Sequence, residues 1–408
     1  MELFALEHKR LWRSTRVWIC VLLCFVYCVI YGSVLSYQWF VFGNVGIDST
    51  SPYKNNFDGY SAIQDYKAQA DKYGDVWTDE AFQQMVKDFQ TMEPPQQLQS
   101  MYDWQTVSSF LNNLYPELMD MESQTYQPLI HYVDTEKLTD FYEKRQEFLD
   151  YNLEVSRQNY LLTDEDVETL REMDSQIEEP YKYDWIQGWS HLLSTSLAST
   201  GSLMAPFLAI VLAFTFSGEW HNSTAPLLHT TKHGWRKLAY VKVLSGLAFA
   251  VELFVLIAGG EILAQLVYLG TSGWDTPIQL IKLVAVAPWN MLQAELYELA
   301  FIFLGVIGYA GVVMLFSALV KNNVLSLVFS LALIEVPGLL GFYLPVWAQD
   351  ASQFIPLVGS PTDIFRMNMF HIFGKGVWMP WMLITVPVLI GIVCTPFAIK
   401  GWARRQKV

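Results

Sequence analysis

A chain of 408 residues with 52% hydrophobic and only 16% charged side chains is too apolar to be a series of ordinary soluble domains. Its net charge of −14 disfavours nucleic acid as a partner. The acidity is local, because 29 of the 40 Asp and Glu but only 10 of the 26 Lys and Arg lie between Phe42 and Asp184. The remainder is mildly basic and strongly apolar, as expected of a membrane body.

The chain begins with a basic segment followed by an apolar run. We expect residues 1–16 to form a cytoplasmic interfacial helix and residues 17–41 to form the first membrane span. The apolar run is longer than the core of a cleavable signal peptide, so we interpret it as an uncleaved anchor. All cysteines lie in apolar stretches: Cys20, Cys24, Cys28 and Cys394. With no His or carboxylate beside them, packing is a better interpretation than a metal site, and no disulfide is expected.

Residues 42–186 form the acidic insert, which is long enough to be a small domain with its own core. Apolar residues recur at helical spacing after Thr78, Thr135 and Thr163, and each of these threonines is suited to cap a helix. No alternating strand pattern competes with this spacing. We therefore expect a mostly helical extracytoplasmic domain, whose many aromatic residues favour core packing over a binding surface.

Five further apolar runs are long enough to cross a bilayer. They lie at residues 187–216, 238–269, 296–320, 324–346 and 377–400. Residues 270–295 and 347–376 are interrupted by Pro and Trp, so we expect interfacial or re-entrant segments on the outer side. The predicted fold is an all-α polytopic membrane protein with six transmembrane helices and a mostly helical extracytoplasmic domain between the first two.

Basic residues outside the insert gather at one side of the predicted spans. Beyond the N-terminal segment this side has Lys232, Arg236, Lys237, Lys242, Lys321, Lys400, Arg404, Arg405 and Lys407, whereas the short loops of the opposite side carry only Lys282, Arg366 and Lys375. The positive-inside rule then places both termini, the loop of residues 217–237 and the tail of residues 401–408 in the cytoplasm. The acidic domain lies outside, and the expected location is a bacterial plasma membrane.

Signatures of catalysis are missing from the sequence. The G-x-x-x-x-G-K-[ST] loop that cradles phosphates does not occur, nor do H-E-x-x-H, G-x-S-x-G or paired Cys and His with zinc spacing. We therefore expect no enzyme, no catalytic residue, no metal and no cofactor. If ATP drives this protein, the ATPase must be another polypeptide.

The informative segment joins the second and third predicted spans and reads FSGEWHNSTAPLLHTTKHGWRKL over residues 216–238. It resembles the linker of ATP-binding-cassette (ABC) type-2 exporter permeases. The matching positions are Glu219, Thr224, Leu227, Leu228, Thr230, Thr231, Gly234, Arg236 and Lys242. The segment departs from the family at Ser223, which is usually Gly, and at Trp235.

Two weaker resemblances agree in order with the first. Residues 7–16 are similar to the basic interfacial helix before the first span of these permeases, and residues 317–323 are similar to their tight inner turn between the fourth and fifth spans. Together the three segments cover a minority of the chain. A large outer insert occurs in only some family members, so no family function is carried over to it.

The resemblance implies a transport permease that moves a hydrophobic or amphipathic substrate, such as a peptide antibiotic, a lipid or a drug, by alternating access. Its implied partners are ABC ATPase subunits, a second permease copy or paralogue, and membrane lipid. A short element between two spans can sit in a cleft of a cytoplasmic ATPase and convert its closure into helix tilting. The implied coupling residues are Glu219, Thr224, Leu227, Leu228, Thr230, Thr231, Gly234, Arg236 and Lys237.

Alternatives remain at each of these points. Glu219, Arg236 and Lys237 are candidates to hold the coupling element through charge pairs, or they are only interfacial anchors. A membrane sensor whose outer domain binds an extracellular ligand is the second function, and a membrane hydrolase is the third. Glu252 and Glu335 lie in apolar runs and either line a path for a cationic or amphipathic cargo or are satisfied by protonation or hydrogen bonds.

Overall fold

The computed structural model describes residues 2–31, 64, 67–68, 70–91, 101–119, 128–231, 235–340 and 343–404, and over these it is mostly helical. Five helices are long and apolar enough to cross a membrane, and a sixth span results if a bent pair of N-terminal helices counts as one. The predicted helical character is confirmed, and the number of helices that could span a membrane agrees with the expected multi-pass membrane protein.

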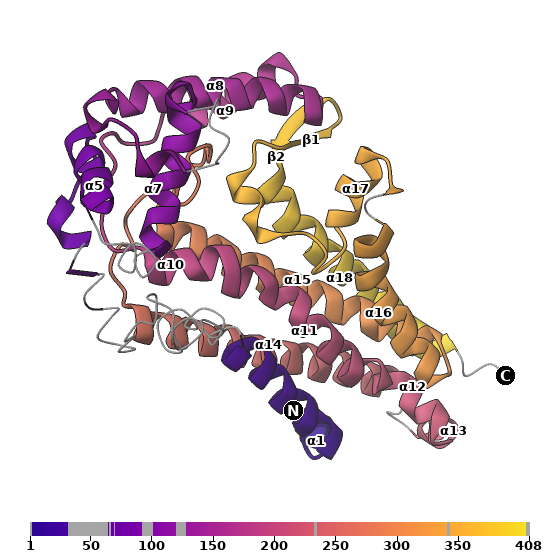
Figure 1. Ribbon diagram of the computed structural model, residues 1–408. Helices are drawn as coiled ribbons and strands as arrows, with labels where there is room; N and C mark the ends of the chain where they lie inside the picture. The colour runs from indigo at the N-terminus through magenta and orange to yellow at the C-terminus, as the bar shows by residue number, and fades with distance from the viewer. Residues whose placement is uncertain are drawn as a thin grey trace.

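The long helices lie side by side, with the acidic domain at one end of the bundle and α1, α12 and α13 at the other (Figure 1). After the acidic domain the chain forms α10 (Gln187–His191), the π-helical η6 (Leu192–Ser196), α11 (Leu197–Leu212), α12 (Phe214–His221), α13 (Ala225–Thr230), α14 (Arg236–Leu269), α15 (Met291–Leu319), α16 (Asn323–Leu340) and α18 (Met379–Arg404). The short η7 (Ile278–Leu280) lies between α14 and α15.

The N-terminal segment is bent. Helix α1 (Glu2–Trp12) makes an angle of 67° with the following stretch, which consists of α2 (Thr15–Phe25) and the π-helical η1 (Val26–Tyr31). Residues 32–41 of the predicted first span lie outside the described residues. Because α1 turns away from α2, it packs along α14.

Helix α15 lies at the centre of the bundle and α16 at its surface. Of the apolar window in each helix, 61% is buried for α15 but only 11% for α16. Helix α15 makes its most extensive contact with α18, and glycines permit the close approach: a Cβ on Gly311 would lie 2.8 Å from the carbonyl oxygen of Gly391. The outward side chains of α16 are therefore available to lipid or to a partner.

The acidic domain has the predicted helical character. Its longer helices are α5 (Asp79–Thr91), α7 (Met101–Leu114), α8 (Phe141–Tyr160) and α9 (Asp164–Asp174), joined by the 3₁₀ turns η2 (Asp71–Tyr73), η3 (Pro116–Leu118), η4 (Leu129–His131) and η5 (Thr135–Lys137). Trp77 packs against Phe82, Phe110 and Phe141 with ring centroids 5.5–5.7 Å apart, so most of these aromatic rings form core.

Helix starts in the acidic domain match the proposed threonine caps at two positions of three. Helix α5 follows Thr78, and α9 follows Thr163, whose side chain forms a capping box with Asp166. The helix expected after Thr135 begins at Phe141 instead. There the Asp79 carboxylate accepts the amide protons of Asp140 and Phe141 at 2.8 and 3.0 Å, so the cap comes from a distant residue.

The expectation of an all-α fold is corrected between α16 and α18. This region contains α17 (Val346–Gln353), η9 (Pro361–Phe365) and a two-stranded antiparallel hairpin of β1 (Met369–Ile372) and β2 (Lys375–Trp378). The turn is Phe373-Gly374, with φ of 51° and 82°, which suits a two-residue hairpin loop. The hairpin reaches the acidic domain, where His371 Nε2 lies 2.8 Å from Asp166 Oδ2.

The acidic domain is fixed to the loop between α14 and α15. Arg145 is 1% exposed, donates to both Asp174 carboxylate oxygens at 2.9 and 2.6 Å, and reaches the carbonyl oxygen of Leu283 at 3.1 Å. Trp185 donates its indole proton to the carbonyl oxygen of Leu269 at 2.8 Å.

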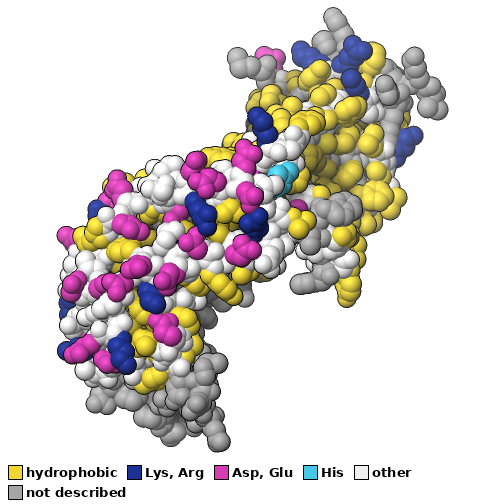
Figure 2. Space-filling model, turned by 90° about the horizontal axis from the view of Figure 1, so that it is seen from above, with side chains coloured by type: hydrophobic (Ala, Val, Ile, Leu, Met, Phe, Trp, Pro, Cys, Tyr) yellow, Lys and Arg dark blue, Asp and Glu magenta, His cyan; other side chains and the backbone are white. Residues whose placement is uncertain are grey.

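Seen from above, acidic side chains cover one part of the molecular surface and hydrophobic side chains the other (Figure 2).

Candidate coupling site

The segment between α12 and α14 is a compact helical turn. Helix α12 ends at His221, Ser223 adopts a left-handed φ of 57°, and α13 then starts with Pro226 in its first turn. Glycine adopts this φ without strain. Ser223 is the position at which ABC type-2 permeases, which this segment resembles, usually have Gly, so the turn here would suit Gly better than Ser. The fold nevertheless keeps the turn with a serine.

Glu219 is the centre of a buried charge cluster. Its side chain is 4% exposed, and its Oε1 accepts from Lys242 Nζ and Arg10 Nη1, each at 2.9 Å. Its Oε2 accepts the hydroxyl proton of Thr224. Lys242 Nζ also lies 3.2 Å from Glu7 Oε2, so two carboxylates and two bases join α1, α12 and α14 at this point.

A cavity lies beside this cluster. Its volume is about 420 Å³, and Arg10, Arg16, Glu219 and Lys242 are among its lining residues. The guanidinium of Arg16 lies over the ring of Phe214, 4.1 Å from its centroid. Polar and charged walls make this cavity suited to water or to a polar group of a partner rather than to an apolar ligand.

A second contact ties α13 to the end of α18. His229 is 6% exposed and lies edge-on to Trp402, with ring centroids 4.6 Å apart. Trp220 of α12 completes the group at 5.8 Å from His229, and Lys321 Nζ lies 4.8 Å from the Trp220 ring centroid. We call Trp220, His229 and Trp402 the aromatic clasp. Together with the Glu219 cluster, it holds α13 as a rigid extension of the bundle.

The predicted coupling residues fall into two groups. Glu219 and Thr224 lie in the buried cluster, and Leu228 is half-buried against the core. The side chains of Leu227, Thr230, Thr231, Arg236 and Lys237 are exposed, and Leu227 is 70% exposed. Gly234 lies outside the described residues.

The charge pairs differ from those expected. Arg236 lies over its neighbour Trp235, with the guanidinium carbon 5.7 Å from the ring centroid, and neither Arg236 nor Lys237 forms an ion pair with another described residue. The partners of Glu219 are Lys242 and Arg10 instead. Lys242 was a position of the family match, and the predicted topology places Arg10, His229 and Trp402 at the same end, but their pairing with Glu219 and with one another could not be predicted from the sequence.

The two carboxylates proposed for a substrate path both face outward. Glu252 is 45% exposed and accepts from His8 Nε2 at 3.0 Å and from the indole nitrogen of Trp12 at 2.8 Å. It therefore anchors α1 to α14. Glu335 is exposed on α16. Besides Glu219, the long helices bury the carboxyl groups of Glu261, Glu295 and Glu298.

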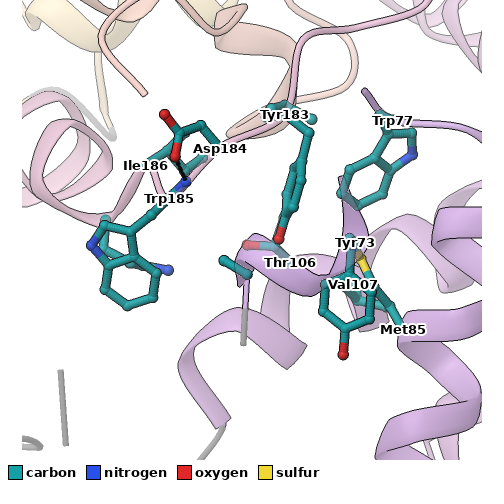
Figure 3. A pocket seen from close by; sticks show the side chains of 12 residues that line it. Tyr73, Trp77, Met85, Thr106, Val107, Tyr183, Asp184, Trp185 and Ile186 are labelled. Atoms are coloured by element: carbon teal, nitrogen blue, oxygen red, sulfur yellow. Dashed lines mark hydrogen bonds between the residues drawn. The ribbon is translucent and has the colours of Figure 1, made fainter. Parts of the chain in front are cut away.

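A smaller cavity lies where the acidic domain meets α10. It has room for about 50 Å³ and is lined by residues that include Tyr73, Trp77, Met85, Tyr183 and Trp185 (Figure 3). The cavity is mostly apolar and aromatic, and its lining reaches Gln187 at the start of α10. It is a second candidate binding site, at the junction of the two parts of the molecule.

Comparison with known proteins does not identify a relative of this chain. No protein-family model, curated protein or solved structure matches this chain. The functional argument therefore rests on the residues and their geometry. They show a short exposed helix, held by a buried charge cluster and the aromatic clasp, between two helices that are long and apolar enough to span a membrane.

Proposed function

We propose that the chain is the membrane-spanning permease subunit of an ATP-driven ABC exporter. It moves a hydrophobic or amphipathic substrate, such as a peptide antibiotic, a lipid or a drug, by alternating access. ATP hydrolysis takes place on separate subunits, and two permeases, identical or related, assemble with two ATPase subunits in a bacterial plasma membrane. Both termini and α13 face the cytoplasm, where basic residues at this end of the bundle agree with the positive-inside rule.

The mounting of α13 is the observation that carries this proposal. Leu227 projects into solvent at 70% exposure, while Glu219 and His229 on either side are buried in contacts with α14 and α18. A displacement of the exposed face of α13 is therefore transmitted both to α14 and to α18. A loop that merely connected two spans would need neither the buried charges nor the clasp.

Association with an ATPase tests the proposal. The tagged full-length chain is co-expressed with the ATPase that we expect the adjacent reading frame to encode, identified by its phosphate-binding loop, and the complex is purified from membranes. Leu227→Asp and Arg236→Glu should reduce recovery of the ATPase, because each alters the exposed face of the coupling element. Leu161→Asp is the matched control, since Leu161 is 81% exposed but lies in the acidic domain.

The outcomes separate the alternatives. Recovery of the ATPase with the unaltered chain and with Leu161→Asp, but not with Leu227→Asp, supports the exporter. Failure of the unaltered chain to retain the ATPase overturns it. If all variants recover the ATPase equally well, α13 does not contribute to the contact between the chain and the ATPase.

A sensor role is the second candidate, and the junction cavity favours it. A ligand held between Trp77 and Trp185 would contact the acidic domain and the lead-in to the second span at the same time. The sensor proposal expects such a ligand to change the tryptophan fluorescence of the purified chain without any ATPase present. If instead an exporter cargo binds in the membrane body, any change in tryptophan fluorescence on its addition should not depend on Trp77 or Trp185.

A further inference from the structure

Three carboxylic side chains are buried together in the half of the bundle next to the acidic domain. Glu261 of α14 and Glu295 and Glu298 of α15 are each at most 2% exposed. Glu261 lies eight residues before the end of α14, and Glu298 lies seven residues after the start of α15. Because these neighbouring helices are joined by a loop and run in opposite directions, both side chains lie about 10–12 Å along their helices from the same end.

The hydrogen bonds of the three carboxyl groups differ. The hydroxyl of Thr200 lies 2.7 Å from each carboxyl oxygen of Glu261 and donates to them. In contrast, none of the four carboxyl oxygens of Glu295 and Glu298 has a hydrogen-bond partner among the described residues. Two acidic side chains in the interior are thus left without the donors that stabilise an ionised carboxylate.

The charged surroundings of Glu295 and Glu298 are acidic. The ionisable groups that act on them are one another and Glu261. The other elements that pack against α15 carry these ionisable residues with described side chains: His191 (α10), Glu219 and His221 (α12), Glu335 (α16), Cys394 and Lys400 (α18), and Asp363 (η9), which pairs with the exposed Arg366. The sequences of η6 and α11 contain no ionisable residue, and α15 itself carries Tyr297 and Tyr309.

Either a metal ion or protons bound to the carboxylates could neutralise this concentration of negative charge. A metal ion needs ligands that converge on one point, and among the described residues no group of three or more His, Cys, Asp or Glu side chains does so. A proton needs no ligand shell, and its addition turns a buried carboxylate into a neutral acid that is far less costly to keep from water. The geometry therefore favours protons.

We propose that Glu295 and Glu298, together with Glu261, form a proton-binding site within the membrane body. In the closed bundle Glu295 and Glu298 are held as neutral acids. Opening of the α14–α15 contact to water lets each O–H bond break and release its proton to the water, and reclosure takes the proton back. The site makes the equilibrium between closed and open bundles depend on pH.

The helices around the site include two π-helical turns. The η6 turn packs against α14 and α15, and the η1 turn packs against α14, where Val29 meets Gly260 next to Glu261. π-helical turns inside α-helices recur at functional sites and at places where a helix changes its register. They provide the elements through which the packing around the carboxylates can change.

Infrared spectroscopy of the purified full-length protein in lipid nanodiscs tests the proposal. A protonated carboxyl group has a C=O stretching band distinct from that of a carboxylate, and it shifts in deuterated water. At mildly alkaline pH we expect this band in the unaltered protein, a reduced band in Glu295→Gln and in Glu298→Gln, and its further loss in the double variant. The matched control is Glu168→Gln, at an exposed acidic-domain position, which leaves the band unchanged.

Thermal unfolding provides a second measurement. Gln has the shape and the neutrality of the protonated acid, so both single variants should match the melting temperature of the unaltered protein near pH 4, where the carboxyl groups are mostly protonated in the folded and the unfolded chain alike. As the pH rises above that, the unfolded chain ionises these carboxyl groups while the closed bundle keeps them neutral, so the unaltered protein should lose stability and melt below both variants at neutral pH. The proposal is overturned if the infrared band is absent from the unaltered protein or if both Gln variants leave it intact. It is also overturned if the melting temperatures of all the proteins depend on pH in the same way.

Discussion

Gly308 of α15 and Gly391 of α18 meet through their backbones: a Cβ on Gly391 would lie 2.6 Å from the Cα of Gly308. The reverse substitution is no easier, because a Cβ on Gly308 would lie 2.3 Å from the carbonyl oxygen of Pro387. Both neighbours are backbone atoms and cannot rotate away. The central helix pair of the bundle therefore depends on these two residues having no side chain.

Gly308→Ala is accordingly expected to force α15 and α18 apart and to destabilise the protein by about 1–3 kcal/mol, as overpacked cores do. The measurement is thermal unfolding of the purified protein in detergent. Gly259→Ala on α14 is the control, because a Cβ there has no atom within 4 Å. Equal melting temperatures for the two variants would contradict the close crossing.

Lys242→Met tests the buried charge cluster. The substitution keeps the length of the side chain but leaves Glu219 buried with Arg10 as its remaining basic partner. Removing one partner of a buried pair costs about 3–5 kcal/mol, and the remaining partner favours the lower end of that range. Lys237→Met should change stability by less than about 0.5 kcal/mol, since Lys237 is exposed.

Chemical denaturation of both lysine variants checks this expectation. A loss of stability confined to Lys242→Met, together with greater protease sensitivity of α1, would show that the cluster holds the N-terminal helix. If both variants unfold alike, the cluster does not stabilise the bundle.

Asp363 gives the protein a pH-dependent stability. Burial raises the pKa of this fully buried carboxyl to about 6, although Arg366, 3.2 Å away, opposes the rise. An ordinary Asp has a pKa of 3.8, so the folded state binds the proton more tightly than the unfolded state. The protein is therefore expected to lose stability as the pH rises from about 4 to 6, and the loss stays constant above that range.

Asp363→Asn removes the charge and should stabilise the protein by about 3 kcal/mol at pH near 8, with little effect at pH near 4. Asp164→Asn, at a position that is 88% exposed, should leave the pH profile of unfolding unchanged. A profile for Asp363→Asn that runs parallel to that of the unaltered protein would contradict the assignment.

Local sequence accounts for much of the secondary structure. Thr163 and Asp166 lie three residues apart and form their capping box without help from the rest of the fold. The start of α8 could not be read in the same way, because its cap is Asp79, which lies 62 residues from Phe141. The hairpin was also not predicted, since each strand has only four residues and β1 contacts the distant acidic domain through His371.

By itself, the sequence determined that the chain is built from apolar helices of bilayer length with an acidic helical domain, because hydropathy and helical spacing are local properties. The tertiary structure alone decided that Glu219 pairs with Arg10, 209 residues away, and that Glu252 faces outward whereas Glu298 is buried. The physical reason is that a membrane helix is apolar on nearly every side. Its composition fixes its length, and only contact with neighbouring helices fixes which side faces the interior.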